Sequence, residues 1–152
     1  MSVDERLSEL GIDLPPLAAP VASYVPVAVA GGLAFVAGQV PLEGGAPMVT
    51  GRLGAELTTE EGAGWARRCG LQVLAALRAE LGSLDAVRGI VKVTVFVAST
   101  DGFTEQPKVA NGASDLFVEV FGEAGKHARS AVSVPALPLG VPVEVEAVAE
   151  LA

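Results

Sequence analysis

The sequence contains few of the residues that build metal centres and disulfide bonds. Cys69 is the only cysteine and His127 the only histidine among 152 residues. A zinc site commonly takes three or four nitrogen or sulfur ligands, and a disulfide takes two cysteines. We therefore expect no metal and no intrachain disulfide, and a reducing compartment such as the cytoplasm. A Cys-His or Ser-His-Asp catalytic device is also disfavoured, because the single histidine follows no evident partner.

Long apolar runs and nucleotide-binding motifs are absent as well. No stretch of about 18 or more uncharged apolar residues occurs, so we expect neither a membrane-spanning helix nor a membrane partner. The first six residues, MSVDER, are polar and acidic, which is unlike a signal peptide. The sequence lacks Gly-x-Gly-x-x-Gly, Gly-x-Ser-x-Gly and a glycine-rich loop ending in Gly-Lys-Ser/Thr. We therefore expect no nucleotide cofactor and no nucleophile elbow.

Positive charge is scarce. The chain contains ten basic and 18 acidic residues, which gives a net charge of −8. Arg67-Arg68 is the one adjacent basic pair. Proteins that bind phosphate backbones gather Lys and Arg into clusters. We therefore expect no specific nucleic-acid partner. A basic groove assembled from several subunits is the alternative that the sequence leaves open.

Hydrophobic residues make up 51% of the chain, which is enough for one packed domain of this length. Thr58 and Glu61 have the spacing of a capping box, worth about 1 kcal/mol, and Gly82 ends the helix that they begin. Periodicity and turn residues predict helices over 2–10, 58–81 and 107–122, strands over 25–30, 33–37, 90–97, 129–134 and 142–151, and a loop over 41–54.

These elements predict an α+β domain built on one mixed sheet. The order is hairpin, helix, strand, helix, hairpin, and short right-handed crossovers place both long helices on one face. In the third strand, alternation puts Val91, Val93, Val95 and Val97 on one face, and Lys92, Thr94 and Phe96 on the other. Two helices cover only one face, and the other is too apolar to remain in water. We therefore expect self-association.

The segment from Arg129 to Pro138, RSAVSVPALP, is followed by Val143-Glu144-Val145-Glu146-Ala147. Together these segments resemble the YjgF/RidA family of enamine/imine deaminases, whose members also carry the label endoribonuclease L-PSP. The likeness covers about residues 20–151, and its short motifs occur in the family's order. The further positions that match are Tyr24, Gly38-Gln39-Val40, Lys92–Val97 and Asn111.

The resemblance implies a chorismate-mutase-like fold, a homotrimer, no cofactor, and a site between subunits for a small carboxylate-bearing imine, enamine or keto acid. In this family's pattern Arg129 holds the substrate carboxylate and Glu144 lies near the attacking water. Tyr24 closes the pocket, and Gly38 lets the substrate approach the backbone. Asn111 and Ala131 complete the set of substrate-binding positions. We expect residues 1–152 to form a single domain, in which 1–19 is an N-terminal extension with a short helix.

Three positions depart from the family pattern. Ala37 stands where members often carry Ser, and Ala131 stands where they often carry Cys or Ser. His127 stands where they often carry Pro. The loss of pocket hydroxyls keeps a non-catalytic small-acid-binding or chaperone-like trimer open beside the deaminase. An endoribonuclease is the third hypothesis, and the net charge of −8 and the single histidine argue against it.

Without the resemblance, the residues singled out above have ordinary structural interpretations. Arg129 would be a surface arginine in a salt bridge, and Glu144 and Glu146 one solvated strand face. Arg67-Arg68 would be a solvated helix face, and His127 a loop residue. Tyr24 and Trp65 would be packing residues, and Cys69 a small core residue on the long helix.

Overall fold

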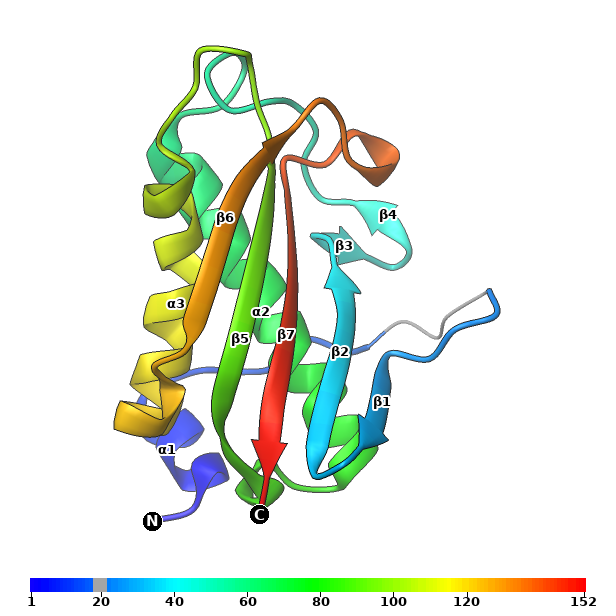
Figure 1. Ribbon diagram of the computed structural model, residues 1–152, viewed down its shortest axis with the longest axis vertical. Helices are drawn as coiled ribbons and strands as arrows, with labels where there is room; N and C mark the ends of the chain where they lie inside the picture. The colour runs from blue at the N-terminus through cyan, green and yellow to red at the C-terminus, as the bar shows by residue number, and fades with distance from the viewer. Residues whose placement is uncertain (18–21) are drawn as a thin grey trace.

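The computed structural model describes residues 1–17 and 22–152. A five-stranded sheet forms the centre, and helices α2 (Thr59–Leu81) and α3 (Gln106–Phe121) cover one face of it (Figure 1). This confirms the prediction of one mixed sheet with both long helices on one face. In spatial order the strands are β1 (Val27–Ala30), β2 (Leu33–Gln39), β7 (Val143–Leu151), β5 (Val87–Ala98) and β6 (Ala128–Val134).

The strand order corrects one prediction. The last two strands, β6 and β7, were expected to form a hairpin, but β7 pairs with β2 and β5, and β6 pairs in parallel with β5 alone. The physical reason is that β5, α3 and β6 form a crossover unit, which brings its two strands side by side. Strand β6, which begins the segment around Arg129, is therefore an edge strand.

Helix α2 begins and ends where the sequence predicts. The Thr58 hydroxyl accepts a hydrogen bond from the Glu61 backbone, and the Glu61 carboxylate accepts one from the Thr58 backbone. Gly82 ends the helix in the left-handed conformation, at φ 82°. Helix α3 buries the whole stripe expected for it: Val109, Ala113, Leu116, Phe117 and Val120. Cys69 of α2 is fully buried in the core, as predicted.

Two local predictions are wrong. Val91 does not share the buried face of Val93, because a β-bulge between Ile90 and Lys92 shifts the register, and its side chain is 45% exposed. The expected loop over 41–54 contains a small hairpin of β3 (Leu42–Glu43) and β4 (Ala46–Pro47). Its turn residues, Gly44 and Gly45, both have positive φ, which is the requirement of a two-residue hairpin turn.

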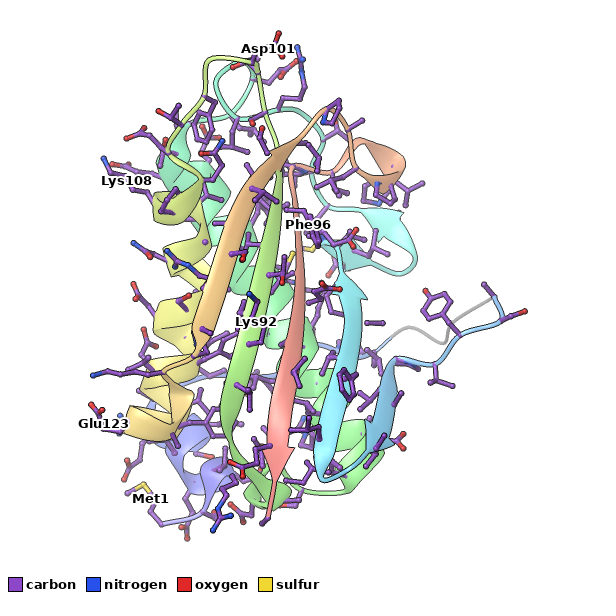
Figure 2. All side chains as sticks on the ribbon, in the orientation of Figure 1. Met1, Lys92, Phe96, Asp101, Lys108 and Glu123 are labelled. Carbon is purple, nitrogen blue, oxygen red and sulfur yellow. The ribbon has the colours of Figure 1, made fainter. Side chains whose placement is uncertain are left out.

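The face of the sheet turned toward the viewer in Figure 1 carries no helix from the described ranges. Lys92 and Phe96 of β5 lie over this open face (Figure 2). Large apolar side chains are exposed beside them, including Phe35 at 45% and Val132 at 43%. The apolar character predicted for both faces is therefore present in the structure.

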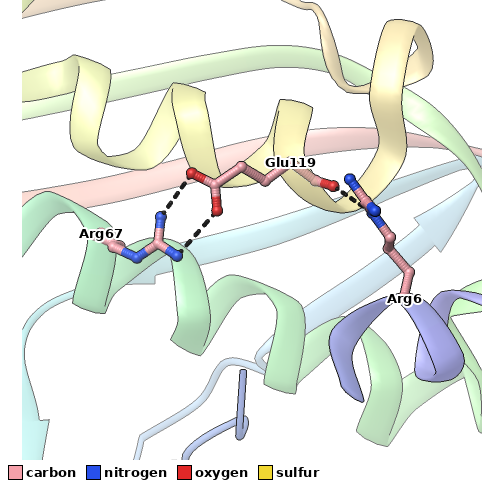
Figure 3. Close-up of polar contacts among 3 residues, drawn as sticks. All are labelled: Arg6, Arg67 and Glu119. Atoms are coloured by element: carbon pink, nitrogen blue, oxygen red, sulfur yellow. Dashed lines mark hydrogen bonds and ion pairs between the residues drawn. The ribbon is translucent and has the colours of Figure 1, made fainter. Parts of the chain in front are cut away.

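The N-terminal helix α1 (Val3–Glu9) is docked on the helical layer. Arg6 Nε donates a hydrogen bond to the Glu119 backbone carbonyl at 3.0 Å, and Leu7 is buried. The Glu119 carboxylate in turn accepts from Arg67 at 3.1 and 3.3 Å, so one α3 residue connects α1 and α2 (Figure 3). Arg67 therefore belongs to a helix–helix contact rather than to a solvated face.

Short 3-10 turns link the remaining elements at Leu84–Ala86, Gly122–Gly125 and Pro138–Gly140. Within the described ranges, no helix is both long and apolar enough to cross a membrane.

Candidate functional site

Arg129 is held in a polar cluster on the helical side of β6. In the register it pairs with the buried Val93, so its side chain points toward α3. Its Nη1 donates hydrogen bonds to Asn111 Oδ1 at 2.8 Å and to Ser114 Oγ at 3.1 Å. Asn111 and Ser114 are three residues apart on α3 and therefore share a helix face. The side-chain partners of Arg129 among the described residues are neutral oxygens, which is not the surface salt bridge of the ordinary interpretation.

His127 extends this cluster. Its Nε2 lies 2.8 Å from Ser114 Oγ, its Nδ1 lies 2.7 Å from the Gly125 carbonyl, and Phe117 packs edge-on against the ring. Burial lowers the pKa of His127, the Gly125 carbonyl opposes that shift, and the Arg129 charge adds to it. A neutral imidazole fits one direction of donation, in which Arg129 donates to Ser114, Ser114 to His127, and His127 to Gly125.

Ala131 lies two residues beyond Arg129 on the same side of β6 and is partly buried. It adds a methyl group and no hydroxyl beside the arginine. The structure therefore brings Arg129, Asn111 and Ala131 together at the edge of the sheet next to α3.

Tyr24 and Gly38 line a separate groove at the other end of the sheet. Its volume is about 490 Å³, and its walls come from the 15–17 segment, β2, the β3–β4 hairpin and α2. Tyr24 is 59% exposed at the rim, which differs from an ordinary packing residue. The α2 side chains that reach the groove are Arg68 and Gln72.

Glu144 lies against Gly38. A Cβ atom added to Gly38 would overlap the Glu144 carboxylate, so the carboxylate keeps this position only while residue 38 is glycine. Glu144 is partly buried, whereas Glu146 two residues later is exposed, so the two do not form one uniformly solvated face. Burial raises the pKa of Glu144, and the nearby negative charge of Glu146 raises it further. A carboxylate with a raised pKa is a better proton acceptor than an ordinary one.

The two groups of residues do not meet within one chain. Arg129 points to the helical side of the sheet, whereas Glu144 alternates with the buried Val143 and Val145 and so faces the open side. Strand β5 also separates β6 from β7. One protomer therefore presents an arginine cluster on the helical side and a glutamate–glycine contact on the open side. Gly38 also lines the groove that Arg68 and Gln72 of α2 reach.

Sequence reasoning missed three side chains near these groups. Ser114 and His127 carried no motif, because their roles depend on the packing of α3 against β6. Arg68 was expected on a solvated face, but its Nε donates to Gln72 Oε1 at 3.1 Å and its Nη2 to the Leu42 carbonyl at 3.2 Å. The missed β3–β4 hairpin supplies that carbonyl.

Comparison with known proteins places the chain among relatives. The family described as "YjgF/chorismate_mutase-like, putative endoribonuclease" matches residues 4–151. Protein TCP17 of Trypanosoma cruzi is 51% identical over 150 residues, which are 98% of this chain and 94% of that protein. The crystal structure of Atu1372 from Agrobacterium tumefaciens, a protein of unknown function, is 40% identical with a TM-score of 0.90, over 99% of this chain and 92% of that one.

A more distant structure is Escherichia coli TdcF with bound serine. It is 25% identical with a TM-score of 0.65, and the match covers 90% of this chain and 94% of TdcF. The family match spans nearly the whole sequence and agrees with the topology described above. This chain belongs to the YjgF/RidA family.

Proposed function

We propose that the protein hydrolyses reactive enamine and imine intermediates, chiefly 2-imino acids, whose carboxylate Arg129 binds. The observation that carries this proposal is the Arg129 guanidinium, which is oriented by Asn111 and Ser114 yet keeps its charge uncompensated by any described carboxylate. A planar guanidinium recognises a carboxylate through two parallel hydrogen bonds. The related TdcF structure holds serine, which also carries a carboxylate.

The reaction asks little more of the protein than positioning. The carbon of a C=N bond is electrophilic, so water adds to it once both are held in place. Glu144 accepts a proton from the attacking water and returns it to the nitrogen. Glu144 then moves the hydroxyl proton of this adduct to the amino nitrogen, and the C–N bond breaks to release ammonia and a 2-keto acid. The raised pKa of Glu144 suits this exchange, because such a carboxylate accepts a proton more readily than an ordinary one.

The site is completed by assembly. Because Arg129 and Glu144 lie on opposite sides of one sheet, we propose a homotrimer with a cleft between neighbours. One protomer contributes Arg129, Asn111 and Ala131, and the next contributes Tyr24, Gly38 and Glu144. The exposed apolar side chains of the open face support self-association, because a patch of this kind is covered in a stable protein.

A second candidate function is binding of a small acid without turnover. Ala37 and Ala131 favour it, because neither provides a hydroxyl to position water or substrate. RNA cleavage has less support. The net charge is −8, and six of the ten basic residues already form ion pairs with carboxylates, which leaves little positive surface for phosphates.

The test is turnover of a freshly generated 2-imino acid such as 2-aminoacrylate, followed by keto-acid release, with melting temperature measured on the same samples. The wild type is expected to accelerate hydrolysis, and Arg129→Ala to lose about 100-fold or more in turnover while it keeps its melting temperature. Arg129→Lys recovers little, since an ammonium lacks the two-pronged donor. An Arg129→Ala variant with wild-type stability and activity would refute the assignment. Arg129-dependent binding of a keto acid without imine hydrolysis would favour the small-acid-binding function.

A further inference from the structure

Most arginines of this acidic chain are neutralised within the protein. Salt bridges to Asp or Glu occupy Arg6, Arg67, Arg78 and Arg88. Among the described residues, two arginines instead have guanidinium groups hydrogen-bonded to neutral oxygens alone. One is Arg129, and the other is Arg68. In a chain with 18 acidic residues, an arginine held in place without a carboxylate is a candidate for binding an anion from outside.

Arg68 is pre-oriented by a chain of hydrogen bonds. Gln72, which is only 8% exposed, donates to the Val40 carbonyl at 2.7 Å and accepts from Arg68 Nε at 3.1 Å. The Leu42 carbonyl accepts from Arg68 Nη2 at 3.2 Å. A guanidinium has five N–H groups, and these contacts use two of them. The remaining donors belong to a side chain that lines the groove, so the groove contains a fixed positive group.

The groove joins Arg68 to the proposed reaction site. Tyr24, Gly38 and Arg68 line the same volume of about 490 Å³. Pockets of that size hold ligands larger than a three-carbon acid. Glu43 also lines the groove, but it is exposed on the β3–β4 hairpin, where water and salt screen its charge. Arg68 is partly buried and less screened.

We propose that Arg68 binds a second acidic group of the ligand and makes the site selective for dicarboxylic 2-imino and 2-keto acids. The inference rests on the proposed function, in which the neighbouring protomer's Arg129 binds the carboxylate next to the reacting carbon. Arg68 then binds the carboxylate at the far end of the ligand. If Arg68 had only a structural role, it would hold the β3–β4 hairpin against α2, and its charge would not affect ligand binding.

The experiment compares two keto acids of equal length by calorimetric titration. 2-Oxoglutarate ends in a carboxylate and 2-oxopentanoate ends in a methyl group, so their difference isolates the distal charge. The wild type is expected to bind 2-oxoglutarate at least about 10-fold more tightly. Arg68→Gln removes that preference and leaves 2-oxopentanoate binding unchanged. Arg68→Lys keeps the charge and retains part of the preference, and it substitutes for the glutamine variant if that one fails to fold.

Arg67→Gln is the matched control, since it removes the same charge one residue away, where the side chain points to Glu119. It keeps the preference for the dicarboxylic acid. Equal affinity of the wild type for both acids, or an equal loss for both in Arg68→Gln, overturns the role of Arg68. If Arg129→Ala still weakens 2-oxopentanoate binding in that case, the proposed function stands. Absence of Arg129-dependent binding of either acid overturns both.

Discussion

The candidate site has two halves, one around Arg129 and one around Glu144, and different interactions hold them in place. Arg129 is positioned by hydrogen bonds to Asn111 and Ser114 on a neighbouring helix, and its environment is polar. Glu144 is positioned by close approach to the backbone of Gly38, and partial burial alters its proton affinity. The first half depends on the hydrogen-bond donors and acceptors around Arg129 more than on the volume of its side chains. In the second half, an atom added at Gly38 would displace the Glu144 carboxylate. Neither half contains the groups that the other provides.

The largest expected effect comes from restoring activity to two defective chains. Arg129→Ala and Glu144→Gln are each expected to lose about 100-fold or more in turnover as pure proteins. Co-expressed in equal amounts, they form mixed trimers in which one Arg129 faces one intact Glu144. About a quarter of all sites are then complete, so turnover returns to about a quarter of the wild-type value.

The control for that experiment is a co-expression in which Arg129→Ala is paired with itself under two affinity tags, which restores nothing. If the mixed sample of the two different variants also remains as inactive as its parents, the two halves do not meet between protomers. Light scattering at micromolar concentration on the same samples reports the assembly directly. A monomer would remove the proposed cleft.

A smaller effect is expected where the glutamate half is overfilled. Gly38→Ala places a methyl group where the Glu144 carboxylate lies, so that the flexible glutamate side chain has to move away. Turnover is expected to fall about 10-fold, because a shift near 1 Å at a reacting group costs roughly that much or more. The melting temperature changes little, since the displaced group reaches solvent on the open face.

Gly64→Ala is the matched control for Gly38→Ala. Gly64 lies within α2, and an added Cβ would meet nothing within 4 Å. It is expected to stabilise the protein by about 0.5–1 kcal/mol and to leave turnover unchanged. Thermal melts and imine hydrolysis on both variants check the pair. Wild-type activity in Gly38→Ala would show that the position of Glu144 does not matter for the reaction.

The sequence was sufficient wherever local chemistry decides the structure. The Thr58–Glu61 capping box, the Gly82 helix end and the buried stripe of α3 all lie where their residue types predict. The failures come from long-range packing. No residue pattern within β7 indicates that this strand lies between β2 and β5. The β-bulge between Ile90 and Lys92 places Val91 on the face opposite to the one expected.

The same limit applies to the site. Motifs located Arg129, Glu144 and Gly38, because each lies in a short pattern that resembles a family. Arg68, Ser114 and His127 gain their roles from partners 13 to 26 residues away in the chain, as in the contacts of His127 with Ser114 and of Arg68 with Leu42. A single sequence contains no local sign of such pairs. Side chains whose roles depend on such pairs are therefore the hardest to interpret without the fold.

The smallest expected effect tests whether the hydrogen-bonded half depends on pH. Burial lowers the pKa of His127 in the folded chain, so between that lowered pKa and the ordinary value near 6.5 the unfolded chain binds more protons than the folded one. The free energy of unfolding therefore decreases as the pH falls below about 6.5 and stops decreasing below the folded pKa. Arg129 is the charged group that acts on the imidazole, and Lys126, the adjacent cation, is paired with Glu123 at 2.9 Å.

Protonated His127 can only donate a hydrogen bond to Ser114 Oγ, so it competes with Arg129 for that oxygen and disturbs the orientation of the guanidinium. Keto-acid affinity is therefore expected to fall over the same pH range. His127→Gln keeps one donor and one acceptor without titrating. Its unfolding free energy and its affinity are expected to lose this component of the pH dependence, and the variant matches the wild type at pH 8. Both are measured from pH 8 to 5 by chemical denaturation and by titration with 2-oxopentanoate. If the wild-type and His127→Gln curves stay parallel through pH 6, His127 does not control the orientation of Arg129. The cluster would then be held by Asn111 and Ser114 alone, and the pH response of binding would have to come from the glutamate half.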